Sequence, residues 1–539
     1  MLARDSVPAR ARNASDAPHR MKSAGDILVG LDAGTSVIKA VAFDLAGNSL
    51  AQASVQNETI VRSRGAAEQD IVAVWGGACT CLRDLADKVP DLRLRTIGLG
   101  VTAQGDGLWP LGRGGESTRN ALIWLDGRSG GIVQALRDSG ADRSIFRHTG
   151  TALSTSLQSA QLAWLKASGD ARLDSLEVIL HCKDWLYYCL TAVRATDRCE
   201  AVNSFGDLRT GTYSPEVLHL LGVEDLRRLL PEIIDGSRLH HPLTRDAGEA
   251  TGLIPGTPVV LAPPDYVATS LAMGLVDPRD GIGCTIVGSA GVHMAVLDDP
   301  QRILGRDPCG YCVYAPVAGT YVRMISHMTG AISIDWLMEN VSILGRTLFG
   351  TALEFSEIVR RLDAEAANST PAGILFHPFM AASGERAPFI DPNARAQFIG
   401  LSQSTSFADI LRAIYEGLGF AARDCYDEMD GLPRKVHVSG GASKSSLLMS
   451  ILASMLGAPV AVLSNVEAGA RGAALIAGAS TGAFASLVDE ARKWQSGLDA
   501  VELAPDPSLK AVYERAFPTY RKSYQRMHET WRELASLGQ

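Results

Sequence analysis

The sequence predicts an α/β protein built from more than one domain. Strand-like and helix-like segments alternate along most of its 539 residues, which is typical of the α/β class. A chain of this length exceeds one ordinary hydrophobic core, so we expect two large domains or three to four small ones. Two distant segments, residues 26–43 and 281–297, share a strand–turn–strand design. This repeat predicts a duplicated architecture with a cleft between the two copies.

Composition excludes several classes of protein. Hydrophobic residues make up 46% of the chain and charged residues 20%, as in a globular protein rather than a disordered or fibrous one. The net charge of -8 argues against nucleic acid as a partner, because surfaces that bind nucleic acid need clustered Lys and Arg. No apolar run reaches the length that spans a membrane, so we expect no membrane partner.

The first 25 residues are polar and lack the apolar core of a secretory signal. We therefore expect a disordered leader on a cytoplasmic protein, with Met21 as an alternative start. The nine cysteines include Cys309 and Cys312, but no second pair stands at the spacing of a zinc ribbon. Reduced, mostly buried thiols are expected rather than a zinc site.

The first strand–turn–strand segment carries polar residues at its tip. Apolar runs on both sides of the turn each predict a strand. Asp32, Thr35 and Ser36 lie in the turn, and Lys39 follows. Gly34 lets the backbone approach a ligand, while backbone N–H groups and two hydroxyls form an anion-sized concavity beside a carboxylate. The turn indicates a site for a phosphate with its magnesium ion; an ordinary hairpin with nothing bound is the alternative.

Regular elements continue through the first half of the chain. The strand at residues 259–262 leads into Asp265, and a helix of small residues follows. At the end of this strand the Asp265 carboxylate would project into the predicted cleft; capping the following helix is its alternative role.

Hydrophobic periodicity predicts helices at 71–88, 154–167 and 183–190, and strands at 96–101, 178–181 and 259–262.

The second half contains a second turn of the phosphate type and a glycine-rich loop. Gly288 and Ser289 occupy the turn of the second strand pair. Further on, a strand runs into Ser439-Gly-Gly-Ala-Ser443, and a helix follows at 444–456 with Ser443 as its expected N-cap. A strand, a Gly-Gly turn and a helix N-terminus together predict a site for phosphate or ribose.

Small residues dominate the segment 467–479. They would allow a planar nucleotide base to lie against the backbone of a helix, which is the interpretation we prefer. Close packing of that helix against a neighbouring element is the alternative, because Gly and Ala also permit two backbones to approach each other.

Several short motifs follow one another along the chain: Asp32-Ala-Gly-Thr-Ser36, Trp124-Leu-Asp-Gly-Arg128, Lys183-Asp-Trp-Leu186, Gly384-Glu-Arg-Ala-Pro388 and the segment 396–416. In these residues, and over about residues 26–485 as a whole, the sequence resembles the FGGY carbohydrate kinases. The resemblance implies two actin-like (ribonuclease H-like) ATPase domains that close on ATP and a sugar. It places an N-terminal sugar- and phosphate-binding domain at 26–276, a C-terminal nucleotide-binding domain at 277–490 and a helical extension at 491–539.

The resemblance also implies roles for single residues. Asp265 is the expected general base, and Asp32 and Asp265 would hold Mg²⁺. The polyol would contact Asp265, Gln104, Asp106 and Trp124, since a substrate covered in hydroxyls needs acceptors as well as donors. For Trp124, core packing is the preferred interpretation, and stacking on the carbon chain of the polyol is the alternative. The phosphates of ATP are expected at Thr35, Ser36, Lys39, Gly288 and Ser289, and the rest of the nucleotide at Gly330, Gly440, Gly441, Ala442 and Ser445.

The substrate is less narrowly defined than the reaction. Residues 102–107 and the approach to Asp265 most resemble the branch of erythritol and L-xylulose kinases. Erythritol is therefore the expected substrate, and L-xylulose, another pentulose or an autoinducer-type sugar is the alternative. Gly105 and Asp106 stand where glycerol kinases have Arg and Glu, which argues against glycerol.

A different class of protein, an actin-like ATPase without a sugar acceptor, would carry the same phosphate turns. Asp265 together with the polar segment 104–106 favours the kinase. The sequence leaves the oligomeric state open, with a homodimer as one candidate.

Overall fold

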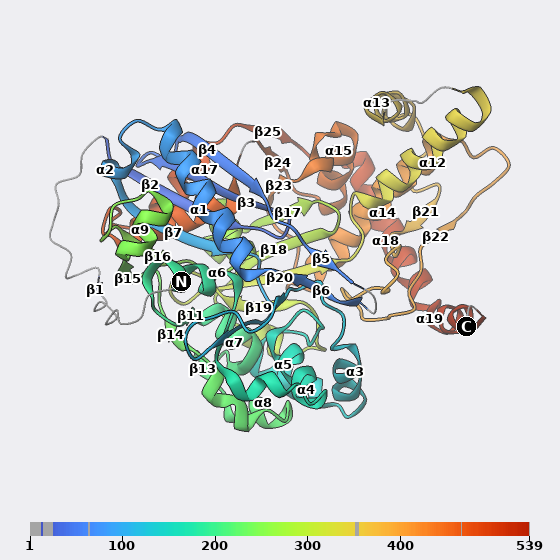
Figure 1. Cartoon of the computed structure of the whole chain (residues 1–539). Coiled ribbons are helices and arrows are strands. Elements are labelled where there is room, and N and C mark those ends of the chain that lie inside the picture. The colour runs from blue at the N-terminus through green and yellow to red at the C-terminus, as the bar shows by residue number, and fades with distance from the viewer. Residues whose placement is uncertain (1–11, 14–24, 63–64, 351–354, 465, 538–539) are drawn as a thin grey trace. The chain divides into compact units, whose positions relative to one another are not determined.

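The computed structural model describes residues 12–13, 25–62, 65–350, 355–464 and 466–537 (Figure 1). These residues fold into two compact units. Unit 1 comprises Met1–Asp277, Leu297–Val322 and Val466–Leu498, and unit 2 comprises Pro278–Val296, Arg323–Asn465 and Asp499–Gln539. Segments of the two units therefore alternate along the chain. The domain boundaries expected near residues 276 and 490 stay predictions. The division into compact units falls after Asp277, and unit 1 also takes Leu297–Val322 and Val466–Leu498 from the segment expected to form the C-terminal domain.

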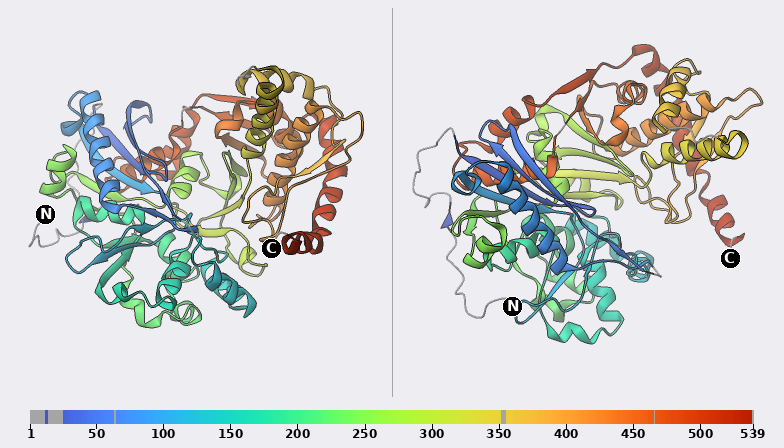
Figure 2. Two further views of the ribbon diagram at one scale, coloured as in Figure 1. Left: turned by 45° about the vertical axis from the view of Figure 1, so that its right-hand side comes forward. Right: turned by 45° about the horizontal axis from the view of Figure 1, so that its top comes forward.

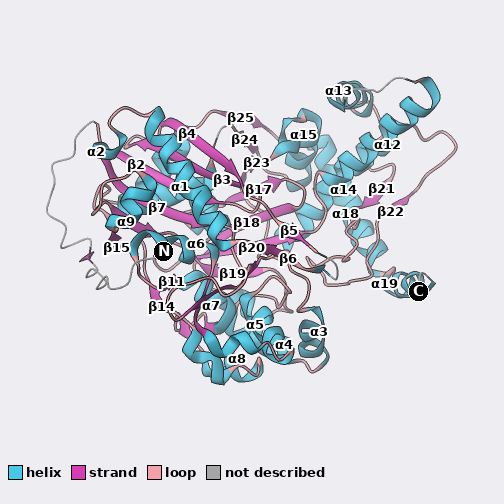
Figure 3. Cartoon of the chain, viewed as in Figure 1, coloured by secondary structure: helices cyan, strands magenta, loops and turns pink. Residues whose placement is uncertain are grey.

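Unit 1 is built on a mixed sheet with the strand order β1-β15-β16-β7-β2-β3-β4. β2 pairs antiparallel with β3, whereas β7 pairs parallel with both β2 and β16. Figure 3 shows these strands in magenta with helices beside them. The strands are β1 (Arg12–Asn13), β2 (Ile27–Ala33), β3 (Val37–Asp44), β4 (Ser49–Gln56), β7 (Thr96–Ala103), β15 (Leu239–Pro242) and β16 (Pro258–Leu261).

Alternate residues of β2 belong to two different hydrophobic cores. Val29 and Leu31 pack in one core with α1 (Ile71–Lys88), and Leu28 packs in another with α16 (Ala468–Ser480). Successive side chains of a strand point to opposite faces of its sheet. Therefore α1 and α16 cover opposite faces, and the sheet of unit 1 is buried on both sides, as its apolar strands require.

The helices of unit 1 follow the predicted periodicity closely. α1 has the predicted bounds and begins where the Asp70 carboxylate accepts the N–H groups of Val72 and Ala73. α5 (Gln158–Ala167) begins later than predicted, because Ser154 and Ser156 bond to each other through their hydroxyls before the helix starts. The predicted helix 183–190 is α6 (Cys182–Thr191), and the predicted strand 178–181 is β10 (Leu176–Leu180).

Unit 2 repeats the central arrangement. The strands β20-β18-β17-β23-β24-β25 follow one another in this order within a seven-stranded sheet that also contains β19 (Tyr311–Tyr314). β17 pairs antiparallel with β18 and parallel with β23, and β23 pairs parallel with β24. The series β3-β2-β7-β16 of unit 1 has the same directions, which confirms the predicted duplication. The strands are β17 (Ile282–Val287), β18 (Gly291–Leu297), β20 (Tyr321–His327), β23 (Lys435–Ser439), β24 (Val460–Leu463) and β25 (Ala500–Leu503).

The helices of unit 2 include a C-terminal pair. Both views in Figure 2 show the red C-terminal helices beside the orange helical part of the same unit. The segment predicted to be a helical extension also contributes a strand, since β25 pairs antiparallel with β24. The helices are α12 (Ile332–Phe349), α13 (Phe355–Ala366), α14 (Phe407–Asp427), α15 (Ser446–Leu456), α18 (Pro507–Gln525) and α19 (His528–Leu537).

The predicted leader lies almost entirely outside the described residues. Of its residues, Arg12 and Asn13 form β1 and pair with His240 and Leu239 of β15. The nine cysteines are free thiols. Within the described ranges, no helix combines the length and the apolar character needed to cross a membrane.

Candidate active site

The tip of the β2–β3 hairpin carries the first group of predicted phosphate residues. Asp32 lies opposite Lys39 in the register of the two strands. The turn, which contains Thr35 and Ser36, is closed by a hydrogen bond of 3.0 Å from the Gly34 N–H to the Val37 carbonyl. The hairpin predicted from the sequence is therefore present at the end of a buried strand.

Lys39 has an acidic partner that sequence reasoning missed. Its Nζ lies 2.8 Å from Oε2 of Glu467. Glu467 itself has a φ of 40°, a conformation that is uncommon for a side chain with a Cβ. Because the two residues are 428 positions apart, no local pattern could reveal the pair.

Two carboxylates meet beside this hairpin. Asp32 stands near the end of β2, and Asp265 follows β16 as the first residue of α10 (Asp265–Ala272). Both strands run parallel to β7, so their carboxyl ends meet at one edge of the sheet. The hydroxyl of Thr102 in β7 donates to the Pro263 carbonyl at 2.6 Å, which fixes the segment before Asp265. Pro264 rather than Asp265 is the N-cap of α10, and the Asp265 carboxylate accepts the N–H of Tyr266 in the first turn at 2.7 Å.

Both carboxyl groups are difficult to ionise in this position. Burial raises the pKa of Asp32 to about 7, although Lys39 partly opposes the shift. Burial and then the charge of Asp32 raise the pKa of Asp265 well above its usual value. A cation between the two groups would lower the cost of their negative charges.

The donor set fits a magnesium ion. Oδ1 of Asp32 is buried and has no hydrogen-bond partner among the described residues, and Asp265 supplies a second carboxylate. Within those residues, no group of three or more His, Cys, Asp or Glu side chains is arranged to hold a metal. Magnesium takes one or two carboxylates and completes its shell with water and phosphate oxygens, so two carboxylates would be enough to hold it.

A chain of hydrogen bonds joins the hairpin to the predicted polyol residues. The Thr35 hydroxyl donates to Oε1 of Gln104 at 3.1 Å and accepts from Nε1 of Trp124 at 2.8 Å. Gln104 in turn donates to Oε1 of Gln69 at 2.6 Å. Trp124 is half-buried, so its side chain is neither fully enclosed in the core nor fully available for stacking on a ligand. The structure thus brings Thr35, Gln104 and Trp124 together and adds Gln69, which sequence reasoning missed.

Asp106 is held in an unusual conformation by three other residues. Its φ is 59°, a region that costs free energy for any residue with a Cβ and is often found at functional sites. The Asp106 N–H donates to Oε1 of Glu200 at 3.1 Å. The Asp106 carboxylate accepts from Nδ2 of Asn203 at 3.3 Å and from the Tyr311 hydroxyl at 2.9 Å. Sequence reasoning missed all three partners, because they come from distant segments.

Glu200 belongs to a buried network of charges. Nζ of Lys183 lies 2.6 Å from Asp184 and 2.8 Å from Asp197, and Nε2 of His181 lies 3.4 Å from Glu200. Burial raises the pKa of Glu200 to about 7, against the opposing effect of His181 and Lys183. The motif Lys183-Asp-Trp-Leu186 was a sequence signal for this network, although it did not indicate which carboxylates Lys183 binds.

In unit 2, the turn between β17 and β18 lies at the start of α12. The Gly330 N–H donates to the Ser289 carbonyl at 2.7 Å, and the Ala331 N–H donates to the Gly288 carbonyl at 2.8 Å. A Cβ on Gly330 would collide with the backbone of Gly288 and Ala290. Glycine at this position therefore allows the turn to approach the N-terminus of α12, where the helix dipole favours an anion.

The glycine-rich loop that follows β23 lies beside Val287, the last residue of β17. Gly440 has a φ of 105°, and a Cβ there would collide with the Val287 backbone. Gly441 is exposed and Ala442 is half-buried. The expectation that Ser443 caps the next helix is wrong, because a 3₁₀ turn at Gly441–Lys444 comes first. Ser445 is the N-cap of α15 instead, accepting from the Leu448 N–H at 3.2 Å, and its hydroxyl donates to Asp363 at 2.9 Å.

The preferred interpretation of the small-residue segment 467–479 is wrong. α16 is buried within unit 1, where Gly469 lies against the Asp32 carboxylate and Gly472 against the backbone of Ala268. Ala470 and Ala473 lie against the backbone of β2 and β7 at Gly30 and Gly100. The small residues serve close packing on the sheet, so they leave no surface for a nucleotide base.

The chain is similar to known carbohydrate kinases along most of its length. Residues 27–272 match the N-terminal domain and residues 284–481 the C-terminal domain of the FGGY family of carbohydrate kinases. The erythritol kinase of Brucella abortus (strain 2308) is 40% identical over 516 residues, which cover 96% of this chain and 99% of that one. A probable L-xylulose kinase of Pasteurella multocida (strain Pm70) is 26% identical over 504 residues, covering 92% and 97%.

The fold of the chain is also similar to that of a solved carbohydrate kinase structure. The crystal structure of xylulose kinase from Rhodospirillum rubrum superposes with a TM-score of 0.83 at 25% identity and covers 94% of this chain and all of that one (100%). The predicted fold, two actin-like ATPase domains, is therefore confirmed. Two domain matches and a 40% identical relative of nearly equal length establish that the chain belongs to the FGGY family of carbohydrate kinases.

Proposed function

We propose that this kinase transfers the γ-phosphoryl group of ATP to a primary hydroxyl of erythritol, with Asp265 as the general base and Mg²⁺ held by Asp32 and Asp265. The observation that carries this proposal is the position of Asp265. It follows a central strand, stands beside the phosphate-type hairpin of Asp32, and lies in the same unit as the fixed carboxylate of Asp106.

The residues around Asp106 favour an uncharged acceptor. Gln104, Asn203 and Tyr311 offer amides and a hydroxyl, and Asp106 and Glu200 offer acceptors. A polyol presents hydroxyls that both donate and accept, so it matches this set. A sugar acid would bring its own carboxylate against two others, which is unfavourable at short range. The 40% identity with an erythritol kinase supports erythritol within the class of polyols.

The chemistry follows from these positions. Asp265 takes the proton of the attacking hydroxyl as the bond to phosphorus forms, a role worth ~10²–10⁴-fold in rate. The phosphates of ATP stay at the predicted residues Thr35, Ser36, Gly288 and Ser289 in this proposal. Magnesium would neutralise charge on the transferred group. The loop of Gly440 to Ser445, with Gly330, holds the rest of the nucleotide in this proposal.

L-Xylulose is the second candidate substrate, because a probable L-xylulose kinase aligns with most of the chain at 26% identity. The preference of the acceptor site for an uncharged substrate does not distinguish L-xylulose from erythritol, since a ketopentose is also uncharged. An actin-like ATPase without an acceptor is the candidate of a different class.

A coupled Mg-ATP assay tests these candidates. We expect erythritol to give the highest kcat/KM among erythritol, threitol, pentitols, L- and D-xylulose and glycerol. Asp265→Asn should lower kcat by ~10²–10⁴-fold. Asp246→Asn is a matched control, because Asp246 is an exposed aspartate in the first turn of α9 (Arg245–Thr251), and it should leave kcat unchanged. If no sugar or polyol raises ADP release above the rate in water, the kinase proposal fails.

A further inference from the structure

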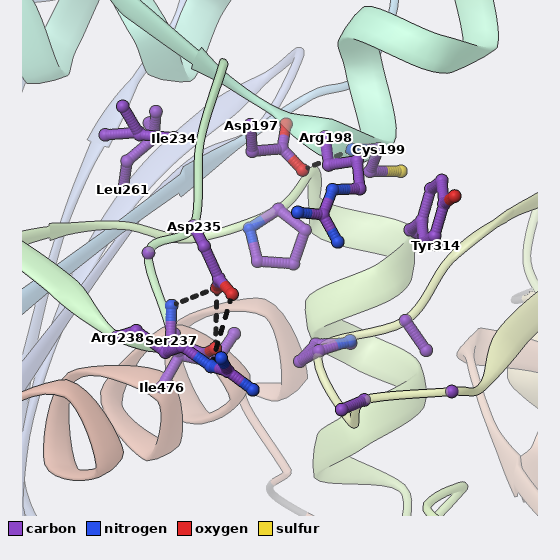
Figure 4. Close-up of a pocket in the computed structure, with 16 residues that line it drawn as sticks. Asp197, Arg198, Cys199, Ile234, Asp235, Ser237, Arg238, Leu261, Tyr314 and Ile476 are labelled. Atoms are coloured by element: carbon purple, nitrogen blue, oxygen red, sulfur yellow. Dashed lines mark hydrogen bonds and ion pairs between the residues drawn. The ribbon is translucent and has the colours of Figure 1, made fainter. Parts of the chain in front are cut away.

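Unit 1 contains a cavity of about 200 Å³ that none of the residues assigned above to the polyol, the phosphates or the metal lines (Figure 4). Its walls are the first turn of α7 (Arg198–Phe205), the turn at residues 235–238 and the segment that follows β19 (Tyr311–Tyr314). Its apolar floor is formed by Ile234, Leu261, Pro263 and Ile476. At ~30 Å³ per water molecule, the cavity has room for a phosphate group that carries a few carbon atoms.

Two arginines line this cavity, and both have unused hydrogen-bonding capacity. No hydrogen bond or ion pair joins the Arg198 guanidinium to another described residue; its central carbon lies over the ring of Tyr314, 5.3 Å from the ring centroid. Figure 4 shows the Arg198 side chain directed into the cavity. Arg238 is 74% exposed, and its closest carboxylate oxygen, on Asp235, is 3.6 Å away.

The carboxylates of the cavity are already engaged with other groups. Asp235 accepts the N–H of Ser237 at 3.0 Å and its hydroxyl at 2.6 Å. Asp197 accepts the Cys199 N–H at 2.9 Å as the N-cap of α7, and it lies 2.8 Å from Nζ of Lys183. Asp235 also pairs with Arg238 at 3.6 Å, and Lys183 opposes the charge of Asp197. Among the described residues, Arg198 is therefore a guanidinium of the cavity that has no carboxylate partner. Guanidinium groups bind phosphate oxygens through paired, charge-assisted hydrogen bonds.

Two walls of the cavity continue into the groups that hold Asp106. α7 begins at Arg198, and its residues Glu200 and Asn203 bond to Asp106. β19 ends at Tyr314, and its first residue, Tyr311, donates to the Asp106 carboxylate. All three contacts of Asp106 therefore come from elements that also line the cavity.

We infer that this cavity binds a small phosphate dianion, either inorganic phosphate or a phosphate monoester, and that its occupation changes the affinity of the acceptor site. The anion would lie between Arg198 and Arg238 and restrain the start of α7. Because Glu200 and Asn203 lie on the same helix, the restraint is transmitted to Asp106. Coupling between two sites commonly changes affinity by about 5–150-fold.

Calorimetry tests the binding site without reference to catalysis. Inorganic phosphate and sn-glycerol 3-phosphate are titrated separately into the full chain, which distinguishes the free ion from the monoester. We expect saturable binding that weakens as salt increases, since charges are screened. Arg198→Gln and Arg238→Gln should each weaken it at least tenfold. Arg245→Gln is the matched control, because Arg245 is 84% exposed, has a carboxylate partner in Glu249 and lies outside the cavity, and it should bind like the parent.

Two results would overturn the inference. The first is the absence of binding heat at millimolar anion. The second is binding of unchanged affinity in the Arg198→Gln, Arg238→Gln double variant, which would place the anion elsewhere in the protein, including the phosphate turns.

Steady-state kinetics tests the coupling, and this arm rests on the proposed kinase function. We expect the bound anion to change the KM for erythritol about fivefold or more in the parent and in Arg245→Gln, but not in Arg198→Gln. An equal effect of the anion on Arg198→Gln would refute the coupling and indicate competition at the active site. If no acceptor is phosphorylated at all, the proposed function fails while the calorimetric result stands.

Discussion

At the scale of residues, the candidate active site contains carboxylates whose backbone conformation or burial costs folding free energy. Asp106 has a left-handed backbone conformation, and the pKa values of Asp32 and Asp265 are raised by burial. Such features cost stability and persist where the surroundings fix them. In this protein Glu200, Asn203 and Tyr311 provide that support for Asp106.

Tyr311→Phe tests the support of Asp106 directly. The substitution removes the hydroxyl that donates to the Asp106 carboxylate at 2.9 Å. A hydrogen bond to a charged group contributes ~1.5–3 kcal/mol, so we expect the KM for the acceptor to rise about tenfold or more while kcat changes little. Steady-state kinetics with erythritol measures both values. Tyr213→Phe, which removes a hydroxyl bonded to the Pro231 carbonyl, should leave the KM unchanged; an equal rise there would show a general loss of packing.

Glu385 gives a prediction about pH and stability. Burial raises the pKa of this carboxyl to about 7, although N–H groups such as those of Arg386 and Met328 partly oppose the shift. The folded state thus keeps a proton that the unfolded state loses near its ordinary pKa of ~4.3. The stability from this proton is complete at low pH and is lost as the pH rises through about 7.

Glu385→Gln removes this titration but keeps an oxygen acceptor. Between pH 5 and pH 7, the free energy of unfolding of the parent should fall relative to that of the variant, by at most ~1.4 kcal/mol per pH unit. Thermal midpoints measured across this range test the prediction. The exposed Glu339→Gln is the control and should run parallel to the parent. A variant whose midpoint tracks the parent at every pH would mean that Glu385 does not titrate in this range.

At the scale of elements, α16 decides the position of α10 and therefore of Asp265. Gly472 of α16 lies against the backbone of Ala268 in α10, and Gly469 lies against the Asp32 carboxylate. Neither contact leaves space for a larger side chain. The helix therefore acts as a closely packed support behind both carboxylates.

Two Gly→Ala substitutions should have opposite effects on stability. In Gly472→Ala the new methyl group collides with the Ala268 backbone, so we expect a loss of ~1–3 kcal/mol from overpacking and a lower kcat. Gly76 lies inside α1 with nothing within 4 Å of a Cβ, so Gly76→Ala should gain ~0.5–1 kcal/mol from helix propensity. Chemical denaturation measures both. If Gly472→Ala is neutral, the close packing of α16 on α10 is not important for stability.

At the scale of the whole molecule, the last helices complete unit 2. Trp531 of α19 is 1% exposed. Its ring lies 5.7 Å from Phe379 and 6.2 Å from Phe389, and the neighbouring His528 lies 2.6 Å from the Asp391 carboxylate. α19 is therefore part of a hydrophobic core, and its removal would expose the rings of Phe379 and Phe389.

Trp531→Ala should lower the stability of unit 2. Truncation of a buried Trp costs ~3–5 kcal/mol. Trp336 on α12 is 42% exposed in the same unit, so Trp336→Ala should change stability by no more than ~0.5 kcal/mol. Scanning calorimetry resolves the effect, because a chain with two compact units can unfold in more than one step. Equal shifts for the two variants would contradict a core role for Trp531.

The sequence by itself determined the class of fold, the duplication and the local turns. It did so because hydrophobic periodicity, glycine in tight turns and the order of short motifs are properties of neighbouring residues. These signals placed α1, the two hairpins and the approach to Asp265 correctly. They also selected Asp32, Thr35, Gln104, Asp106 and Trp124 as candidates; all five lie in unit 1, and hydrogen bonds join Thr35 to Gln104 and Trp124.

Only the tertiary structure decided which distant groups support those residues. Glu467 pairs with Lys39, Tyr311 holds Asp106, and α16 packs on the sheet of unit 1 instead of lying against a nucleotide. Each of these contacts joins segments that are far apart in the chain. A run of Gly and Ala has the same local pattern whether it accommodates a ligand or a strand, so the neighbour that it meets after folding determines its role.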